Sequence, residues 1–513
     1  MSDYNFLIES KLSQEQYNVL SLISRAAYEQ GLNLYLVGGA VRDLTYGQQV
    51  VRDLDFALEG DPQKVLRRLE ARESSSPAGH TARPATGSGE SLAVEYEEFD
   101  EATASVELWF SNDVRVELAQ CHEPLLARPG QRPVLQPASI FEDLRRRDFS
   151  ANAMAISLHP NSRGLLLDPT NGAADIERQE LRALHPRSFS QDPSRLYRLL
   201  RLAWRLDFTV EERTAKYFEA AIQNRAFERL TPDQQSRELR AILEEDDPAR
   251  VLKLLAQRKL LAGLDKKLAS SRLTYEHFSR SRSAAQTVAG VSPYLVNFLC
   301  LVEKLSGSEK LRMAKKVLRS GKAIREVMSM ESDAKKLSRV LLSSKVTLPH
   351  QVYNLLSKES RHLLLYLLVY YRQAMVQSRV KNYLTKYLPL RARLPRAELQ
   401  ALGLKPGAKF DQVLESVFVD QLDGKLRSPM QVTKALQERA GIKPPPPPEP
   451  PPRPHHARKP KPAAPGKPAA PGKPAALPEQ RPAASPAPAQ ASPAAASKGK
   501  SSGKLARPAR AAS

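Results

Sequence analysis

Apolar residues follow two different periods along the chain, and the change between them separates a mixed region from a helical one. Up to about residue 140 the apolar runs are short, and two of them alternate with polar residues, which is typical of strands. A helix is expected over 12–29, where Ser13 and Gln16 have the spacing of a capping box. The runs expected to be strands are 34–37, 54–58, 105–110 and 114–118, of which the last two predict a hairpin. This pattern predicts a small mixed sheet flanked by helices.

Beyond about residue 141 the apolar residues take the spacing of amphipathic helices as far as about residue 438. Only 165–167 is expected to be a strand in this part. The clearest helices are 193–206, 211–224, 233–243 and 248–257. Residues 73–91 lack apolar periodicity and are rich in turn-forming residues, so they predict a mobile loop or insertion.

The last part of the chain, residues 441–513, has a different composition. It holds 21 of the 40 prolines and a net charge of +11, half of the total of +22. Such a segment cannot bury an apolar core, so it is expected to be disordered with polyproline character. The rest of the chain is long enough for several packed domains.

Composition also bounds the class of protein. An excess of 78 Lys and Arg over 56 Asp and Glu favours a polyanionic partner, most often nucleic acid. Cys121 and Cys300 are too few for a disulfide framework or a structural zinc site, and we expect them to be buried in a reduced, cytoplasmic compartment. We expect neither a secretory signal nor a membrane span, because no apolar run is long enough.

The densest chemical signal starts at the two glycines that follow the first expected strand. Gly38 and Gly39 would let backbone N–H groups approach a phosphate closely at the start of a short helix. Taken alone, the pair is equally consistent with a purely structural turn.

Asp53 and Asp55 lie two residues apart on the next expected strand, so both carboxylates share one face. Like charges repel unless a cation lies between them, and with a third carboxylate such a pair can hold two divalent ions for phosphoryl or nucleotidyl transfer. Glu117, which alternates with Val116 and Leu118, offers that third carboxylate. The alternatives are that the Asp pair is simply solvated and that Glu117 faces water.

The segment LVGGAVRDLTYGQQVVRDLDFAL resembles the opening signature of class II tRNA nucleotidyltransferases and bacterial poly(A) polymerases. Five later segments resemble that family in the same order, with a weak middle between about 270 and 390. They are EDLRRRDFSANAMAISL, LLLDPTNGAADIERQELRAL, QDPSRLYRLLRLAWRLDF, RLTPDQQSRELRAILEEDDPARVLKLLAQRKLLAGL and LPRAELQALGLKPGAKFDQVLESVFVDQLDGKL. The resemblance implies an α+β protein with a polymerase beta-like head and an all-α remainder. Its domains would be a catalytic head at 1–160, nucleotide-selecting neck helices at 161–265, an RNA-binding body and tail at 266–440, and the disordered segment 441–513.

The resemblance also implies roles for individual residues of this chain. Asp53 and Asp55 match the metal-binding pair, and Glu117 matches the third catalytic carboxylate, although the LAQCHE that follows it departs from the family's threonine-rich continuation. The residues implied to bind the incoming nucleotide are Gly38, Gly39 and Arg42 at the triphosphate, Arg147, Asp148 and Asn152 at the ribose and phosphates, and Asp192 and Arg195 at the base.

Asp192 and Arg195 are three apart on an expected helix and hence on one face, as an ordinary surface ion pair would be. A carboxylate beside a guanidinium presents an acceptor next to donors, which matches the Watson–Crick edges of cytosine and adenine but not those of uracil and guanine. The preceding residue is Gln191, where the family commonly has Glu, so one charge is missing from this site.

The expected function is therefore template-independent addition of C and A from CTP and ATP to the 3′ end of tRNA, with Mg²⁺ as cofactor and pyrophosphate as product. The expected partners are tRNA or another RNA 3′ end, and no membrane. Poly(A) polymerase activity and addition of only A or only C remain open. A noncatalytic RNA-binding protein is the alternative from another class, and the retained Asp53 and Asp55 argue against it.

Overall fold

The computed structural model of the chain describes residues 3–47, 51–75, 92–100, 104–112, 114–124, 135–318 and 320–441. These form two compact units, of which the first comprises the described residues up to Leu394 with 418–425 and the second comprises Pro395–Val417 with 426–441. The predicted disordered tail lies outside the described residues, except for Gly441. So does the predicted loop beyond Ser75, and its first residues, 73–75, are helical instead.

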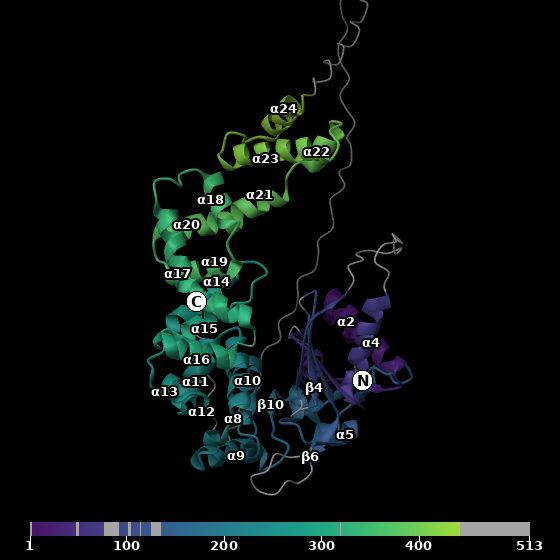
Figure 1. Cartoon of the computed structure of the whole chain (residues 1–513). Coiled ribbons are helices and arrows are strands. Elements are labelled where there is room, and N and C mark those ends of the chain that lie inside the picture. The colour runs from purple at the N-terminus through teal and green to yellow at the C-terminus, as the bar shows by residue number, and fades with distance from the viewer. Residues whose placement is uncertain are drawn as a thin grey trace, which may run out of the picture. The chain divides into compact units, whose positions relative to one another are not determined.

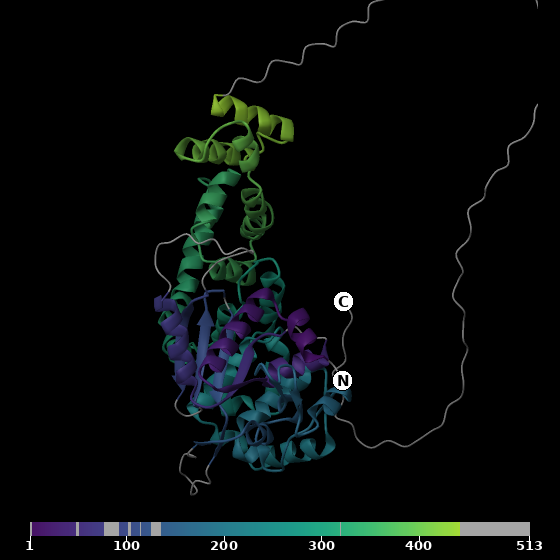
Figure 2. The ribbon, with the colours of Figure 1, turned by 90° about the vertical axis from the view of Figure 1, so that its right-hand side faces the viewer.

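A mixed sheet forms the N-terminal part of the first unit, as predicted (Figures 1 and 2). It has seven strands, of which 94–100 and 155–157 were not expected from the sequence. The strands follow the order β3-β4-β5-β2-β1-β8-β9, and within it only β2 and β5 run parallel. Their bounds are β1 (Asn33–Val37), β2 (Leu54–Glu59), β3 (Val94–Asp100), β4 (Ser105–Phe110), β5 (Arg115–Gln120), β8 (Ala155–Ser157) and β9 (Leu166–Leu167). Two further two-stranded ladders are β6 (His122–Pro124) with β7 (Leu135–Pro137) and β10 (Glu180–Leu181) with β11 (Thr209–Val210).

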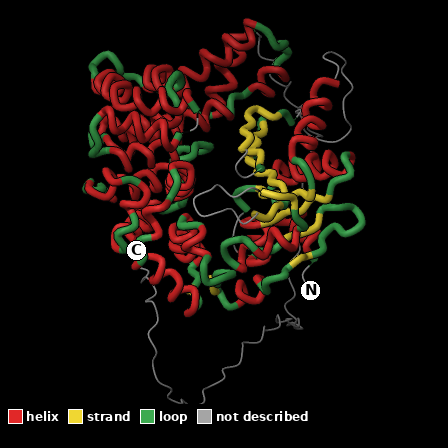
Figure 3. The backbone as a smooth tube through the Cα atoms, turned by 60° about the horizontal axis from the view of Figure 1, so that its bottom comes forward, coloured by secondary structure: helices red, strands yellow, loops and turns green. Residues whose placement is uncertain are grey.

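Helices form the rest of the first unit (Figure 3). Those associated with the sheet are α1 (Tyr4–Lys11), α2 (Gln14–Glu29), α3 (Gly38–Tyr46), α4 (Pro62–Ser75), α5 (Ile140–Arg145), η1 (Ser150–Asn152) and α6 (Gly172–Glu177). The following group is α7 (Ser188–Gln191), α8 (Ser194–Leu206), α9 (Glu212–Gln223), η2 (Ala226–Arg229), α10 (Pro232–Leu243), α11 (Pro248–Gln257), α12 (Leu261–Leu264) and α13 (Lys266–Ser270). The last group is α14 (Tyr275–Ala285), α15 (Tyr294–Val302), α16 (Gly307–Val317), α17 (Gly321–Leu342), α18 (Pro349–Leu356), α19 (Arg361–Tyr370), α20 (Ala374–Asn382), η3 (Tyr383–Tyr387) and α21 (Leu388–Ala392).

The second unit has its own small apolar core around Phe410 and Leu436. It is built from α22 (Arg396–Ala401), the first part of α23 (Ala408–Leu422) and α24 (Pro429–Ala440). Ser428 and Gln431 form a capping box at the start of α24.

The alternation of apolar and polar residues decides which face of the sheet is covered. Leu54 and Phe56 of β2 point into the main core, which α2 and α4 complete on that side. Ala57 points to the opposite face and joins a smaller cluster under α5 with Val37 and Leu144. Because Asp55 has the parity of Ala57, its carboxylate lies on this second, only partly covered face.

The predicted helix 12–29 is confirmed as α2, and its capping box between Ser13 and Gln16 is present. The predicted hairpin is confirmed as β4 and β5. The expectation that 165–167 would be the only strand after about residue 141 is wrong, because β8, β10 and β11 also lie there. These strands have two or three residues each, and so short a run carries no readable period.

Both cysteines are unpaired and buried, as expected. Among the described residues, no helix is both long enough and apolar enough to cross a membrane.

Helix α6 packs against η1, the turn that carries Asn152, and this contact depends on a glycine. The carboxylate of Asp168 accepts the backbone N–H groups of Gly172, at 2.7 Å, and Ala173, at 2.9 Å, and so caps the helix. A Cβ on Gly172 would collide with the backbone carbonyl oxygen of Ser150. The collision involves backbone on both sides, so no rotamer change relieves it.

We expect Gly172→Ala to lower the free energy of unfolding by about 1–3 kcal/mol, because η1 must shift to accept the methyl group. Gly307→Ala is the matched control, since Gly307 also begins a helix and nothing lies within 4 Å of the position that a Cβ on it would occupy. Urea unfolding of both variants measures the difference. Equal stability of the two variants would contradict the close contact between α6 and η1.

Candidate active site

The turn between β1 and α3 brings the backbone against two side chains of opposite charge. Gly38 has a φ of +67°, and a Cβ on it would lie 3.2 Å from Asp55 Oδ2 and 3.4 Å from Arg147 Nη1. A Cβ on Gly39 would lie 3.5 Å from Arg42 Nη2. Glycine is therefore required at position 38, whereas a Cβ on Gly39 would make only ordinary contacts, and the turn places the N-terminus of α3 beside a carboxylate and two guanidinium groups.

The three predicted carboxylates lie on neighbouring strands. Asp55 of β2 is the register partner of Glu117 of β5, and Asp53 lies one residue before β2. Glu117 is exposed, as the alternative held, but it shares its face of the sheet with Asp55. Burial, and then the charges of Glu117 and Asp53, raise the pKa of Asp55 to about 7. The three charges are thus close enough to interact, and no ion pair between described residues engages any of them.

An oxygen-only set of ligands suits a hard divalent cation such as Mg²⁺. These residues fit such an ion, because the register of β2 and β5 sets Asp55 and Glu117 on one face of the sheet and a cation between them would remove their repulsion. In the described part of the chain, no three acidic, His or Cys side chains are already gathered as a complete metal site. The three carboxylates therefore form an open edge that a bound triphosphate would have to complete.

Arg147 is aimed by an acidic residue that was not predicted from the sequence. Asp143, in the first turn of α5, is buried and accepts Arg147 Nε at 2.9 Å and Arg146 Nη2 at 2.6 Å. Burial alone would raise the pKa of Asp143, but Arg147 and Arg146 together lower it below its ordinary value. The i, i+3 and i, i+4 spacings from Asp143 were the available sequence signal.

Arg42 is 2% exposed and belongs to a buried chain of polar contacts. Its Nε donates to Asp43 Oδ1 at 2.8 Å, and its Nη1 donates to Asn152 Oδ1 at 2.6 Å. Its Nη2 lies 2.7 Å from Asp43 Oδ1 without hydrogen-bond geometry, and in the described structure this buried atom has no hydrogen-bond partner. Since Nη2 lies beside Gly39, the missing acceptor would be at the glycine turn.

Asp148 continues this chain of contacts to the helices beyond the sheet. It accepts Asn152 Nδ2 at 3.1 Å and Arg198 Nη1 of α8 at 2.7 Å. Burial opposes its ionisation, but Arg198 and Arg195 lower its pKa to about 2. Asp148, predicted to contact ribose and phosphates, is thus engaged by protein groups and positions Asn152.

The residues predicted to select the base do lie together, although Asp192 precedes the helix rather than being in it. Asp192 Oδ2 lies 3.5 Å from Arg195 Nε, within the first turn of α8. Arg195 Nη1 donates to Ser188 Oγ at 2.8 Å, and its Nη2 donates to the Arg146 carbonyl at 2.9 Å. The guanidinium is therefore fixed against two elements while it retains unused N–H groups.

The acidic residues that follow α10 form ion pairs with two arginines, one just before β2 and one on β5. These contacts were not predicted from the sequence. Arg52, next to Asp53, pairs with Asp246 at 3.0 Å and with Glu245 at 3.5 Å. Arg115, on the same strand as Glu117, pairs with Glu107 at 3.0 Å and with Glu244 at 3.6 Å. The only signal in the sequence was the run LEEDD, whose partners are about 130–190 residues away.

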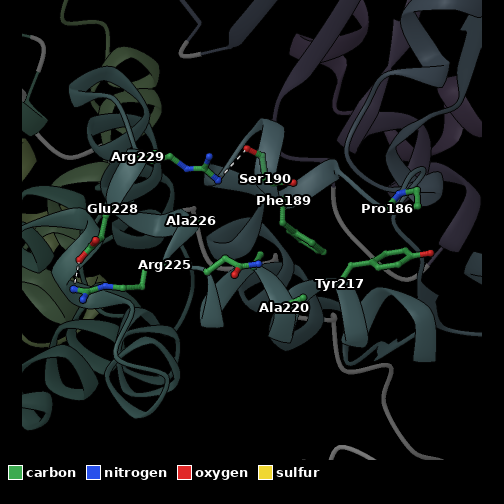
Figure 4. Close-up of a pocket in the computed structure, with 11 residues that line it drawn as sticks. Pro186, Phe189, Ser190, Tyr217, Ala220, Arg225, Ala226, Glu228 and Arg229 are labelled. Carbon is green, nitrogen blue, oxygen red and sulfur yellow. Dashed lines mark hydrogen bonds and ion pairs between the residues drawn. The ribbon is translucent and has the colours of Figure 1, made fainter. Parts of the chain in front are cut away.

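A hollow of about 660 Å³ lies beside α7, α9 and η2, outside this set of residues (Figure 4). Phe189 and Tyr217 form part of its wall, and Arg229 Nη2 donates to the Ser190 carbonyl at 3.5 Å. It holds none of the predicted site residues, and its one acidic lining residue, Glu228, is paired with Arg225. The residues predicted from the sequence to form the site therefore all lie outside this hollow.

Comparison with known proteins agrees with the motifs. Residues 34–182 match the family model described as the poly A polymerase head domain. The A-adding tRNA nucleotidyltransferase of Halalkalibacterium halodurans is 32% identical over 47% of this chain and 52% of that protein. The CC-adding tRNA nucleotidyltransferase of Deinococcus radiodurans is 37% identical over 34% of this chain and 41% of that protein.

A solved structure of the Thermotoga maritima CCA-adding enzyme complexed with tRNA is 23% identical, with a TM-score of 0.42 over 86% of this chain and 99% of that one. This distant likeness carries no part of the assignment. The chain spans between a quarter and about half of the length of the curated relatives that it matches. In its head-domain match and in the name that these relatives share, the chain is similar to the family of class II tRNA nucleotidyltransferases and bacterial poly(A) polymerases that the motifs predicted.

Proposed function

We propose that the protein is a template-independent RNA nucleotidyltransferase that adds C and A from CTP and ATP to the 3′ end of tRNA. In each cycle the RNA 3′-hydroxyl oxygen would bond to the α-phosphorus of the nucleotide, the hydroxyl proton would leave, and the bond to pyrophosphate would break. The observation that carries the proposal is the register of β2 and β5, which places Asp55 opposite Glu117 and beside the glycine turn.

Asp53, Asp55 and Glu117 would hold divalent cations, for which we propose Mg²⁺. When bound, these ions would lower the pKa of the RNA 3′-hydroxyl and neutralise charge on the triphosphate and the departing pyrophosphate. The carboxylates of this chain would orient the reacting groups, and a bound cation would favour the ionised form of Asp55, whose pKa is raised without one.

The triphosphate would bind at the turn between β1 and α3. The backbone N–H groups of the first turn of α3 are unused by the helix, and its N-terminus carries positive potential. Arg42 and Arg147 would add charge-assisted contacts, since Arg42 Nη2 has no hydrogen-bond partner in the described structure and Arg147 Nη1 lies beside Gly38.

Asp192 and Arg195 would select the base. One carboxylate oxygen of Asp192 would accept from the amino group of cytosine or adenine, and an unused guanidinium N–H of Arg195 would donate to the adjacent ring nitrogen. Uracil and guanine present a carbonyl oxygen and a ring N–H there, so they would leave both protein groups unsatisfied.

The helices at 161–265 would form the nucleotide-selecting neck, and 266–440 would bind RNA. The excess of Lys and Arg in the chain supports contacts to RNA phosphates, which read the shape of an A-form stem rather than its sequence. The buried, unpaired thiols of Cys121 and Cys300 suit the cytoplasm, the compartment that we propose.

Addition of A alone is the second candidate, because relatives that are 33% and 32% identical are named A-adding enzymes. Poly(A) polymerase activity and noncatalytic RNA binding remain the further alternatives. One assay separates all four, namely incubation with tRNA lacking its CCA end, with tRNA ending in CC, and with an unrelated RNA, each with Mg²⁺ and single labelled nucleotides. C followed by A on tRNA supports the proposal, A only after CC supports A addition, and long A tails on any RNA support a poly(A) polymerase. No incorporation of any nucleotide leaves noncatalytic RNA binding.

We expect Asp53→Ala to reduce incorporation below detection while leaving tRNA affinity unchanged, because the carboxylate holds cations rather than RNA. Single-turnover extension and filter binding measure the two properties. Glu9→Gln, at an exposed position of α1, is the control and should behave as the unaltered protein. If Asp53→Ala loses tRNA binding as well, the role assigned to this residue is wrong.

The raised pKa of Asp55 predicts how stability depends on pH. A carboxyl whose pKa is higher in the folded state favours folding fully below its unfolded pKa, near 4, and this contribution is lost as the pH rises through about 7. We therefore expect Asp55→Asn to be more stable than the unaltered protein at pH 8, with a free energy of unfolding about 2–4 kcal/mol higher and a higher melting temperature. The difference should be smaller at pH 5.

Adding MgCl₂ at pH 8 should raise the melting temperature of the unaltered protein but not that of Asp55→Asn, while NaCl of equal ionic strength should affect both alike. Differential scanning fluorimetry provides this comparison without any nucleotide. The same Mg²⁺ response in both proteins would show that this carboxylate does not hold the cation.

A further inference from the structure

Gln234, at the start of α10, joins this helix to the carboxylate proposed to read the base. Its Oε1 accepts the backbone N–H of Thr231 at 3.0 Å, which is one half of a capping box. Its Nε2 donates to Asp192 Oδ1 at 2.9 Å, across 42 residues of sequence. One side chain therefore has two separate tasks, one local and one directed at the site.

The contact from Gln234 helps to decide which oxygen of Asp192 is available. Oδ1 also accepts the backbone N–H of Ser194 at 3.1 Å and its hydroxyl at 2.6 Å, so three donors converge on it. Three donors exceed the two lone pairs of one carboxylate oxygen, and Oδ1 has no capacity left. Oδ2 has only the longer contact of 3.5 Å to Arg195 and remains open.

The guanidinium of Arg195 is held by different groups. The hydroxyl of Ser188, which is fully buried, and the carbonyl of Arg146 accept its two terminal nitrogens. The carbonyl oxygen of Ser188 also accepts the backbone N–H of Asp192 at 3.1 Å, but no hydrogen bond between described residues joins Ser188 or Arg146 to the Asp192 carboxylate. The groups that hold the carboxylate oxygen and those that hold the guanidinium are therefore different. On the side of Asp192, Gln234 is the support that comes from outside its own turn.

We propose that Gln234 is a positioning residue for base selection. Its hydrogen bond saturates Asp192 Oδ1, so that Oδ2 is the oxygen presented to the base. This inference rests on the proposed function, since it assigns a role within the proposed nucleotide site. Without the donor from α10, the carboxylate can turn about its side-chain torsions, and the spacing of acceptor and donors that fits cytosine and adenine is no longer maintained.

The capping box allows the two tasks of Gln234 to be separated. Glu serves as well as Gln in a capping box, because only the carbonyl-type oxygen is needed there. Gln234→Glu therefore keeps the cap of α10 but replaces the donor facing Asp192 by an acceptor with a like charge. Gln431→Glu is the matched control, since Gln431 is the third residue of the same kind of capping box at α24.

The experiment measures incorporation of CTP, ATP, UTP and GTP on tRNA lacking its CCA end, together with binding of ATP and GTP without RNA by calorimetry. We expect Gln234→Glu to raise the KM for CTP and ATP roughly tenfold and to lower their preference over UTP and GTP by a similar factor. Its melting temperature should remain that of the unaltered protein. Gln234→Ala should lose the same preference and also melt earlier, whereas Gln431→Glu should keep the preference.

Unchanged base preference in Gln234→Glu would overturn the inference and leave Gln234 as a helix cap only. If the unaltered protein incorporates no nucleotide but binds ATP more tightly than GTP, and Gln234→Glu removes that difference, the proposed function fails while the role of Gln234 stands. If the unaltered protein neither incorporates nor discriminates, both are overturned.

Discussion

The structure depends on one electrostatic constraint, the parallel pairing of β2 with β5 that sets Asp55 directly opposite Glu117. Two carboxylates held side by side on a partly covered sheet repel each other, and Asp53 adds a third charge at the end of the strand. The fold accepts a carboxyl with a pKa of about 7 at a position where an apolar residue would cost nothing. This is a local conflict of the kind that stays in a protein when a ligand resolves it.

The groups around the carboxylates are arranged to keep them free. Arg147 would neutralise Asp55 if nothing else engaged it, but the buried Asp143 holds its Nε and leaves Nη1 at the glycine turn. Arg42 is held by Asp43 and Asn152 in the same way. Each arginine is thus tied at one end to a protein acceptor and presents the other end to the turn where a triphosphate would bind.

Buried ion pairs extend from this site into the helices of the first unit. Asp148 ties η1 to Arg198 of α8, and Glu238 of α10 lies 3.5 Å from the same guanidinium. Through Gln234, helix α10 also reaches Asp192. Helix α8 therefore supports η1 through Arg198, and α10 supports Asp192 through Gln234, whereas Arg147 and Arg195 are held by other elements. Breaking one partner of such a network leaves a buried charge, which makes the arrangement of the site stiff.

The sequence by itself determined the elements and the chemistry that local rules can express. Alternation predicted the hairpin of β4 and β5, a capping box predicted the start of α2, and the glycine pair with Asp53 and Asp55 predicted the type of site. Strands β8, β10 and β11 were not predicted, because a run of two or three residues shows no period. These residues are strands because they pair with distant strands. Only the tertiary structure showed that Asp143 orients Arg147 and that Gln234 orients Asp192. It also showed that Asp148 accepts hydrogen bonds from Arg198 and Asn152. Apart from those of Asp143 and the one between Asp148 and Asn152, these contacts join residues with no spacing rule between them, since a hydrogen bond depends on distance in space and the folded chain alone supplies that distance.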